Sequence, residues 1–137
     1  MKPDQFIGYC LANASSITSI VGTRIFNSIR PNSTTLSLIP AINYYEVSSG
    51  GELNGLGQKN ITVNARAETQ RQAIDLGDKI IKLFNGANGS GIQGTLNGFD
   101  LDKMYLLNIG GLIPENDTGW YNYPIDFKMI YRLDTVS

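Results

Sequence analysis

The residue types that most often perform catalysis are scarce in this chain. It has no histidine, which removes the commonest general base and the commonest metal ligand. Its single cysteine, Cys10, cannot form an internal disulfide. Cys10 lies between Phe6-Ile7 and Leu11, so we expect a buried structural thiol with no neighbour to lower its pKa. Nucleophilic catalysis of the Ser–His or Cys–His kind therefore has no support in the sequence.

Two acidic clusters are the remaining candidates for chemistry. Asp100 and Asp102 form one cluster, and Glu115 and Asp117 form the other. Hard cations bind clustered oxygen ligands, but neither cluster has the spacing of a known calcium or magnesium loop. Nothing among the 12 acidic residues selects a pair for carboxylate-pair hydrolysis either. We therefore predict no catalytic, metal-binding or cofactor-binding residues, and no enzyme.

One glycine motif matches a nucleotide-binding pattern in its letters alone. Residues 89–94 read Gly-Ser-Gly-Ile-Gln-Gly, which fits G-x-G-x-x-G. The motif follows a predicted helix and precedes a predicted strand. A dinucleotide fingerprint needs the opposite order, because the phosphate must meet the N-terminus of a helix. We reject it as a cofactor site.

The composition limits the classes of partner. The 137 residues are enough for one domain, which we predict to span 1–137 and to need no disulfide or metal. The 11 basic and 12 acidic residues are dispersed and give a net charge of −1, so no basic run predicts specific nucleic-acid binding. The start of the chain lacks a signal-peptide core, and no apolar run reaches membrane-spanning length. We expect a soluble protein made in a cytoplasm, with no membrane partner.

A strand followed closely by a helix, within Lys59–Phe84, organises the chain. Apolar residues alternate with polar ones from Ile61 to Arg66, which predicts a strand with one buried face. Thr69-Gln70-Arg71-Gln72 reads as a capping box, and the apolar residues that follow recur at the helical period as far as Phe84. Gly77 lies inside that apolar stripe, which indicates close approach of the helix to a sheet.

The other elements complete a sheet. A helix from Pro3 to about Asn13 and a short turn over 17–21, capped by Ser15-Ser16, precede a brief extended piece at 24–26. Further strands are predicted at 41–47, 92–96, 101–109 and 121–133, with an Asn97-Gly98 turn. Pro124 lacks a ladder donor, so its part of the last strand should be at an edge or irregular. The fold class is therefore α+β, a mostly antiparallel sheet with two main helices packed on it and long β-arm loops.

Ser48 to Gln58 contains four glycines between two predicted antiparallel strands. The segment is too long for a tight hairpin turn, so we expect a projecting, mobile β-arm. An Ω-loop packed on its own subunit is the alternative.

Apolar and aromatic residues occur in three predicted loops. Any one of them can fold back on the core, but all three loops together suggest a surface that another chain covers. The candidate subunit or tube interface comprises Leu36, Leu38, Glu52, Leu53, Asn54, Leu56, Ile113, Trp120 and Tyr121.

The order of these features resembles one family. A short helix leads to Ile20-Val-Gly-Thr-Arg-Ile-Phe26, a loop leads to Ile39-Pro-Ala-Ile-Asn-Tyr44, and a glycine-rich arm precedes the strand 61–66. The helix Thr69-Gln-Arg-Gln-Ala73 to Leu83-Phe-Asn-Gly86 and paired C-terminal strands follow. This order is similar to that of the tail terminator, or tail completion, proteins of long-tailed bacteriophages. Ala67 to Leu76 and the Pro40 strand carry most of the resemblance.

The resemblance implies an α+β virion subunit that assembles in the host bacterial cytoplasm into a ring, a hexamer. Such a ring caps the tail tube, stops its elongation and offers the head-joining surface, so the implied partners are further copies, the tail tube protein and a head-completion or connector protein. Projecting β-arms could block the sheet edges of a tube. The alternatives are a head–tail connector or neck ring protein and, in a different class, a small cytoplasmic enzyme or ligand-binding domain.

Overall fold

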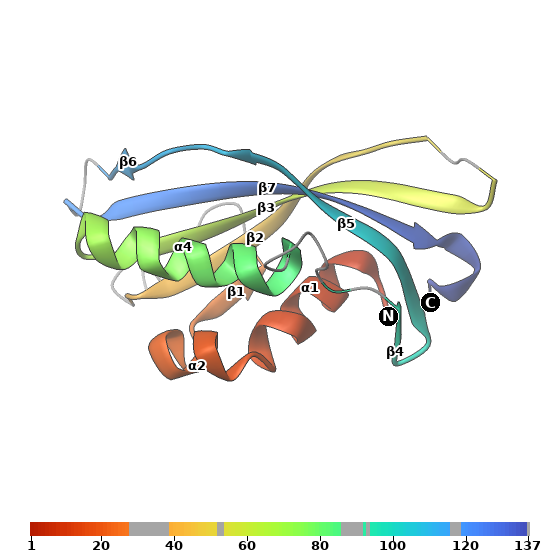
Figure 1. Cartoon of the computed structure of the whole chain (residues 1–137), viewed down its shortest axis with the longest axis horizontal. Helices are drawn as coiled ribbons and strands as arrows, with labels where there is room; N and C mark the ends of the chain where they lie inside the picture. The colour runs from red at the N-terminus through yellow and green to blue at the C-terminus, as the bar shows by residue number, and fades with distance from the viewer. Residues whose placement is uncertain (28–38, 52–53, 86–91, 93, 116–118, 137) are drawn as a thin grey trace.

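In the residues that the structure describes, a curled seven-stranded sheet carries three helices on one side (Figure 1). This computed structural model describes residues 1–27, 39–51, 54–85, 92, 94–115 and 119–136. The helices are α1 (Pro3–Ala12), α2 (Ser15–Val21) and α4 (Gln70–Asn85), and a 3-10 turn η1 (Leu133–Thr135) follows the last strand. The strands are β1 (Ile25–Asn27), β2 (Ala41–Ser49), β3 (Leu56–Ala67), β4 (Gly94–Leu96), β5 (Phe99–Ile109), β6 (Ile113–Pro114) and β7 (Tyr121–Arg132).

The strand order is β1-β2-β3-β7-β5-β4, with β6 pairing with β7 beyond the end of β5. All pairs are antiparallel except β1 with β2. The β3–β7 ladder is the longest and runs without a shift from Leu56 opposite Arg132 to Ala67 opposite Tyr121. The predicted α+β, mostly antiparallel class is confirmed, and β3 and β7 form its centre.

Helix α4 lies across the middle of this sheet and packs on β3, β7 and β5. One half of the predicted capping box is present, since the Thr69 hydroxyl accepts the backbone N–H of Gln72 at 3.2 Å, whereas no hydrogen bond from the Gln72 side chain back to Thr69 is seen. A Cβ on Gly77 would lie 3.2 Å from the ring of Tyr123 and 3.4 Å from Ile125. The predicted close approach of helix to sheet is therefore confirmed.

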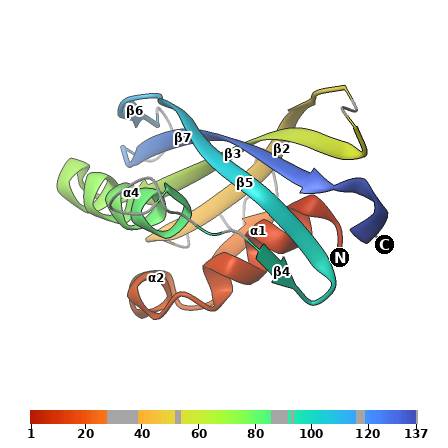
Figure 2. The same cartoon turned by 45° about the vertical axis from the view of Figure 1, so that its right-hand side comes forward.

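Helices α1 and α2 extend the same layer under β1 and β2 (Figure 2). Phe6 of α1 packs on Phe99 of β5 with ring centroids 4.9 Å apart, and Phe84 of α4 packs edge-on against Phe127 of β7. One hydrophobic core thus joins all three helices to one face of the sheet. The predicted Ser15-Ser16 cap of α2 was wrong, because Ala14 occupies the cap position and no side chain caps the helix.

The two turn and proline predictions have clear outcomes. Asn97 and Gly98 join β4 to β5 with φ values of 51° and 81°, the conformation that a two-residue hairpin turn of this sequence requires. Pro124 lies in the central strand β7, so it is not at a sheet edge. Its carbonyl accepts the N–H of Gly110, between the end of the β5 ladder and the start of β6. The N–H that proline lacks would therefore point to a gap in the pairing, and the predicted irregularity is present.

The β2–β3 connection is shorter than the sequence predicted. Ser48 and Ser49 belong to β2, and β3 begins at Leu56, so the strands take up both ends of the predicted 48–58 arm. The N–H of Gly50 bonds the carbonyl of Gln58 at 2.9 Å and continues the ladder. The correction arises because serine and glycine residues at the ends of a hairpin lack apolar alternation yet still pair through their backbones. Figure 1 shows this end of the hairpin, in yellow, projecting beyond the helices.

Candidate functional site: partner-binding surfaces

The face of the sheet that carries no helix in Figure 1 bears a row of hydrogen-bonded polar side chains, and we call it the helix-free face. Along β3 the even-numbered residues Thr62, Asn64 and Arg66 lie on it. The Asn64 amide nitrogen donates to the Oδ1 atoms of Asn43 on β2 and Asn122 on β7, each at 3.1 Å. The amide row therefore ties three strands together through side chains as well as backbones.

The strongest contact of this row is a buried ion pair. The Arg66 guanidinium, 2% exposed, donates from Nε and Nη2 to the two carboxylate oxygens of Glu115 at 2.9 and 3.0 Å. Its Cζ also lies 5.9 Å from the centroid of the Trp120 ring. Since Glu115 directly follows β6 and Trp120 directly precedes β7, Arg66 holds both sides of that connection on the sheet.

Two buried side-chain atoms in the described part of the chain have no hydrogen-bond partner, and both lie on the helix-free face. They are Oδ1 of Asn64 and Nη1 of Arg66. Buried polar atoms are nearly always paired, because an unpaired one loses its hydration without compensation. The core between the sheet and the helices shows no such atom among the described residues.

Two β-bulges add apolar side chains to this polar face. Val47 is the extra residue in β2, between Glu46 and Ser48, and Leu107 is the extra residue in β5, between Leu106 and Asn108. Their side chains are 60% and 52% exposed. A hollow of about 340 Å³ lies between them, and its lining includes Thr62, whose hydroxyl donates to Asp126 at 2.7 Å.

The sheet also presents unpaired strand edges among the described residues. β4 pairs with β5 from Phe99 to Leu101, and no described residue pairs with the outer side of 102–109. On the opposite side of the sheet, β1 pairs with β2 from Ile42 to Tyr44, and no described residue pairs with the outer side of 45–49. Backbone N–H and C=O groups along such edges are available to another strand.

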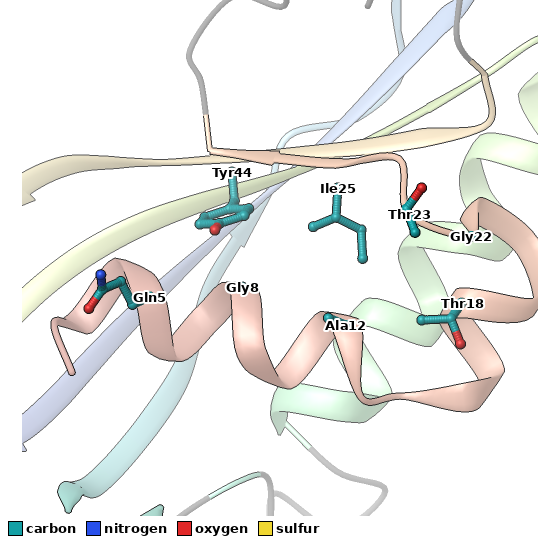
Figure 3. A pocket seen from close by; sticks show the side chains of 8 residues that line it. All are labelled: Gln5, Gly8, Ala12, Thr18, Gly22, Thr23, Ile25 and Tyr44. Carbon is teal, nitrogen blue, oxygen red and sulfur yellow. The ribbon is translucent and has the colours of Figure 1, made fainter. Parts of the chain in front are cut away.

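A third surface lies between α1 and the β1–β2 edge. Figure 3 shows Tyr44 and Ile25 directed from the strands toward Gln5, Gly8 and Ala12 on α1. The open groove has a volume of about 690 Å³. Gly8 permits the contact, because a Cβ there would collide with the Tyr44 hydroxyl, and burial raises the pKa of that hydroxyl. The described lining contains no carboxylate, amine or thiol to perform acid–base chemistry.

The residues considered for chemistry are separated in the structure. Cys10 is 7% exposed, and burial raises the pKa of its thiol to about 12, so the predicted structural thiol is confirmed. Asp100 and Asp102 lie near the start of β5, beside the end of β7, whereas Glu115 lies beside the start of β7 and pairs with Arg66. Glu115 therefore does not meet Asp100 or Asp102, and Asp117 lies outside the described residues. Among the described residues no three His, Cys, Asp or Glu side chains gather in a metal-binding group, and no helix is long and apolar enough to cross a membrane.

The structure separates the predicted interface residues into two places. Asn54 is exposed and Leu56 half-buried at the tip of the β2–β3 hairpin. Ile113, which is 50% exposed, lies with half-buried Trp120 and Tyr121 around the β6–β7 connection. Four further members of that set, Leu36, Leu38, Glu52 and Leu53, lie outside the described residues. The assignment of these residues to an interface stays a prediction.

Exposed apolar residues on the strands escaped the sequence analysis. Tyr105, Leu107 and Ile109 of β5 are 39%, 52% and 43% exposed, and Val47 is more exposed still. The sequence predicts them as strand residues, and the predicted interface comprises loop residues alone. A signal was available, because these apolar residues lie in the predicted strand 101–109, which is longer than its predicted hairpin partner 92–96.

The same fold occurs in a known structure. No protein-family model and no curated protein sequence matches the chain. A solved structure described as the virion of a native gene transfer agent (GTA) particle contains a similar chain, with a TM-score of 0.67 and 9% sequence identity. The match covers 96% of this chain and 95% of the other. At this identity, the likeness shows a shared fold over nearly the whole length.

Proposed function

We propose that this protein is a structural subunit of a phage-like particle, and more specifically a tail terminator. In this role identical subunits form a ring, a hexamer, that caps the tail tube, stops its elongation and offers the surface to which the head is joined. The protein acts as one domain spanning 1–137, and its partners are further copies of itself, the tail tube protein and a head-completion or connector protein. It belongs in the tail or neck of a virion assembled in a bacterial cytoplasm.

The observation that carries the proposal is the shared fold. A chain in a virion has a similar fold, and the match covers 96% of the present chain. The sequence resemblance to tail terminators independently points to the same kind of particle. Fold alone does not determine function, so the specific role depends on the surfaces.

Those surfaces suit a subunit that contacts several neighbours. Exposed apolar side chains lie on the opposite open edges of the sheet, and Ile113 adds another beside β7. The unpaired buried atoms of Asn64 and Arg66 lie on a face between those edges. A ring subunit needs two complementary side surfaces for its neighbours, together with end surfaces for the tube and the head.

A head–tail connector or neck ring protein is the second candidate. The similar chain belongs to a structure described as a whole virion, so the fold likeness favours a particle component over any one position in the particle. A small enzyme or ligand-binding domain would have to use the groove beside α1, whose described lining has no acid–base pair. We therefore favour the two ring functions over that class.

The test is deletion of the coding sequence from the genome that encodes the particle, followed by electron microscopy of the products. Loss of a tail terminator gives overlong tails and full heads that stay separate, and expression of the full-length chain restores joined particles of normal length. Loss of a connector gives tails of normal length that fail to join heads. Normal particles from the deletion strain would contradict both ring functions.

A further inference from the structure

We infer that neighbouring subunits join by strand pairing, with the open edge of β5 (102–109) in one copy paired with the open edge of β2 (45–49) in the next. This inference rests on the proposed ring and names the contact that builds it. The partner is a second copy of this chain, and the contact is an antiparallel pair of strands.

Strand direction supports a contact between copies. Strands β2, β3, β7 and β5 are consecutive antiparallel neighbours, so β2 and β5 run in opposite directions at the two sides of a four-stranded block. If the next copy is related to the first by rotation about an axis parallel to the strands, β2 and β5 keep the same directions in both copies. The β5 edge of one copy then meets the β2 edge of the next in antiparallel orientation, the more stable pairing, and each contact leaves one edge free for another copy.

The side chains on the two edges fit the same contact. Tyr105, Leu107 and Ile109 on β5 and Val47 on β2 make up four of the seven large apolar side chains that are exposed in the described chain. A monomer usually protects an open edge with proline, charge or a β-bulge. The open part of β5 has no proline, and its charges, Asp102 and Lys103, lie at one end, where the ammonium of Lys103 is 5.0 Å from the Tyr105 ring centroid. The bulge at Leu107 lies within the edge but leaves an apolar side chain exposed there. An apolar edge of this length is suited to burial in an assembly.

The charges on the edges do not oppose the contact. Asp102 and Lys103 offset each other on β5, and the carboxylate of Glu46 on β2 is held by Lys59 at 2.6 Å. The bulges at Val47 and Leu107 place their extra side chains beside the hollow on the helix-free face. Pairing the two edges would also bring Val47 of one copy close to Leu107 of the next, so that both apolar side chains become buried.

Cysteine cross-linking tests the inference directly. Full-length Leu107→Cys is combined in turn with Tyr45→Cys, Val47→Cys and Ser49→Cys, and particles assembled in the producing cells are oxidised and separated without reductant. At least one combination should give a ladder of covalent multimers, while each single substitution gives none. The native Cys10 does not interfere because it is buried. Tyr9→Cys combined with each β2 cysteine is the matched control, since Tyr9 is 38% exposed but lies on α1.

The alternative outcomes are distinct. Dimers from Leu107→Cys alone would show β5 paired with β5 and would overturn the head-to-tail contact. Rings visible by electron microscopy with no ladder from any combination would overturn strand pairing and leave the proposed function intact. If the cysteines prevent assembly, Leu107→Lys decides by particle yield. It should abolish ring formation, whereas Leu133→Lys, at a residue 37% exposed outside both edges, should preserve it; equal yields would refute the inference.

Discussion

At Thr62 and Arg66 the helix-free face of β3 is almost as buried as its core face, but the two faces are built from opposite chemistry. Toward the helices the strand presents Ile61 and Val63, both fully buried in the apolar core. Toward the helix-free face it presents Thr62 and Arg66, which are 4% and 2% exposed. Burial in this strand is therefore not a measure of hydrophobic character.

The two faces of β3 should tolerate different kinds of substitution. The core face gains free energy in proportion to the apolar area it buries, so losing methyl groups costs stability gradually. The helix-free face depends on matched partners, because a buried polar group that loses its partner keeps the full cost of desolvation. Substitutions there should depend on whether the partner is changed at the same time.

The largest effect should come from breaking the buried ion pair. Glu115→Ala leaves the Arg66 guanidinium buried without its carboxylate, and we expect a loss of about 3–5 kcal/mol in the free energy of unfolding. Urea denaturation measures it. The double variant Arg66→Met/Glu115→Leu is the control, because it removes both charges and should recover most of the loss. A double variant as unstable as Glu115→Ala would show that the pair contributes packing rather than charge matching.

On the core face, Ile80→Ala should cost about 2–5 kcal/mol, since Ile80 is fully buried between α4 and the sheet. Lys82→Ala on the exposed side of the same helix is the control and should change stability by less than about 0.5 kcal/mol. Both values come from the same denaturation series. A small loss at Ile80 would mean that the helix layer moves to fill the cavity.

The comparison also shows what the sequence could predict. The core face was accessible, because alternation in Ile61–Arg66 and the helical period after Thr69 are local patterns that need only neighbouring residues. The turn at Asn97-Gly98 and the packing role of Gly77 followed from local chemistry in the same way. Two predictions were wrong, the Ser15-Ser16 cap and the length of the β2–β3 loop. Tertiary contacts, not local preference, decide where those elements begin and end.

The contacts of the helix-free face could not be predicted from such local patterns. Asn64 meets partners 21 and 58 residues away in the chain, and Arg66 meets Glu115 at a separation of 49. No periodicity connects these positions, so asparagine and arginine on alternate sites simply read as solvent-facing. The interface prediction considered apolar residues in loops alone, which is why the exposed apolar residues of β5 were overlooked.

A smaller effect should separate two adjacent residues of β3. Thr62→Val keeps the shape but removes the hydroxyl that donates to Asp126, and we expect a loss of about 1.5 kcal/mol, because Asp126 is only half-buried and water can replace part of the bond. Thr62→Ser keeps the donor and should recover part of the loss. Ile61→Val on the opposite face should cost about 0.5–1.5 kcal/mol. A neutral Thr62→Val would contradict the role of polar pairing on this face.

The smallest effect should occur on the projecting part of the hairpin, where Lys59 donates to Glu46 at 2.6 Å. The hydrogen bond that Lys59 donates to Glu46 raises the pKa of the Lys59 ammonium. The two side chains are 23% and 38% exposed, so Lys59→Met should cost only about 0.2–1 kcal/mol at neutral pH. Because the folded pKa is the higher one, this stabilisation is complete below the ordinary lysine pKa and is lost as the pH rises through the folded value. Denaturation of wild type and variant at pH 7 and above about pH 11 should therefore show a difference in stability that shrinks at the higher pH, and high salt should reduce this difference as well.

Lys82→Met on α4 is the control for general charge effects. If the loss of stability in Lys59→Met were the same at both pH values, the aliphatic stem of Lys59, rather than its charge, would stabilise the hairpin.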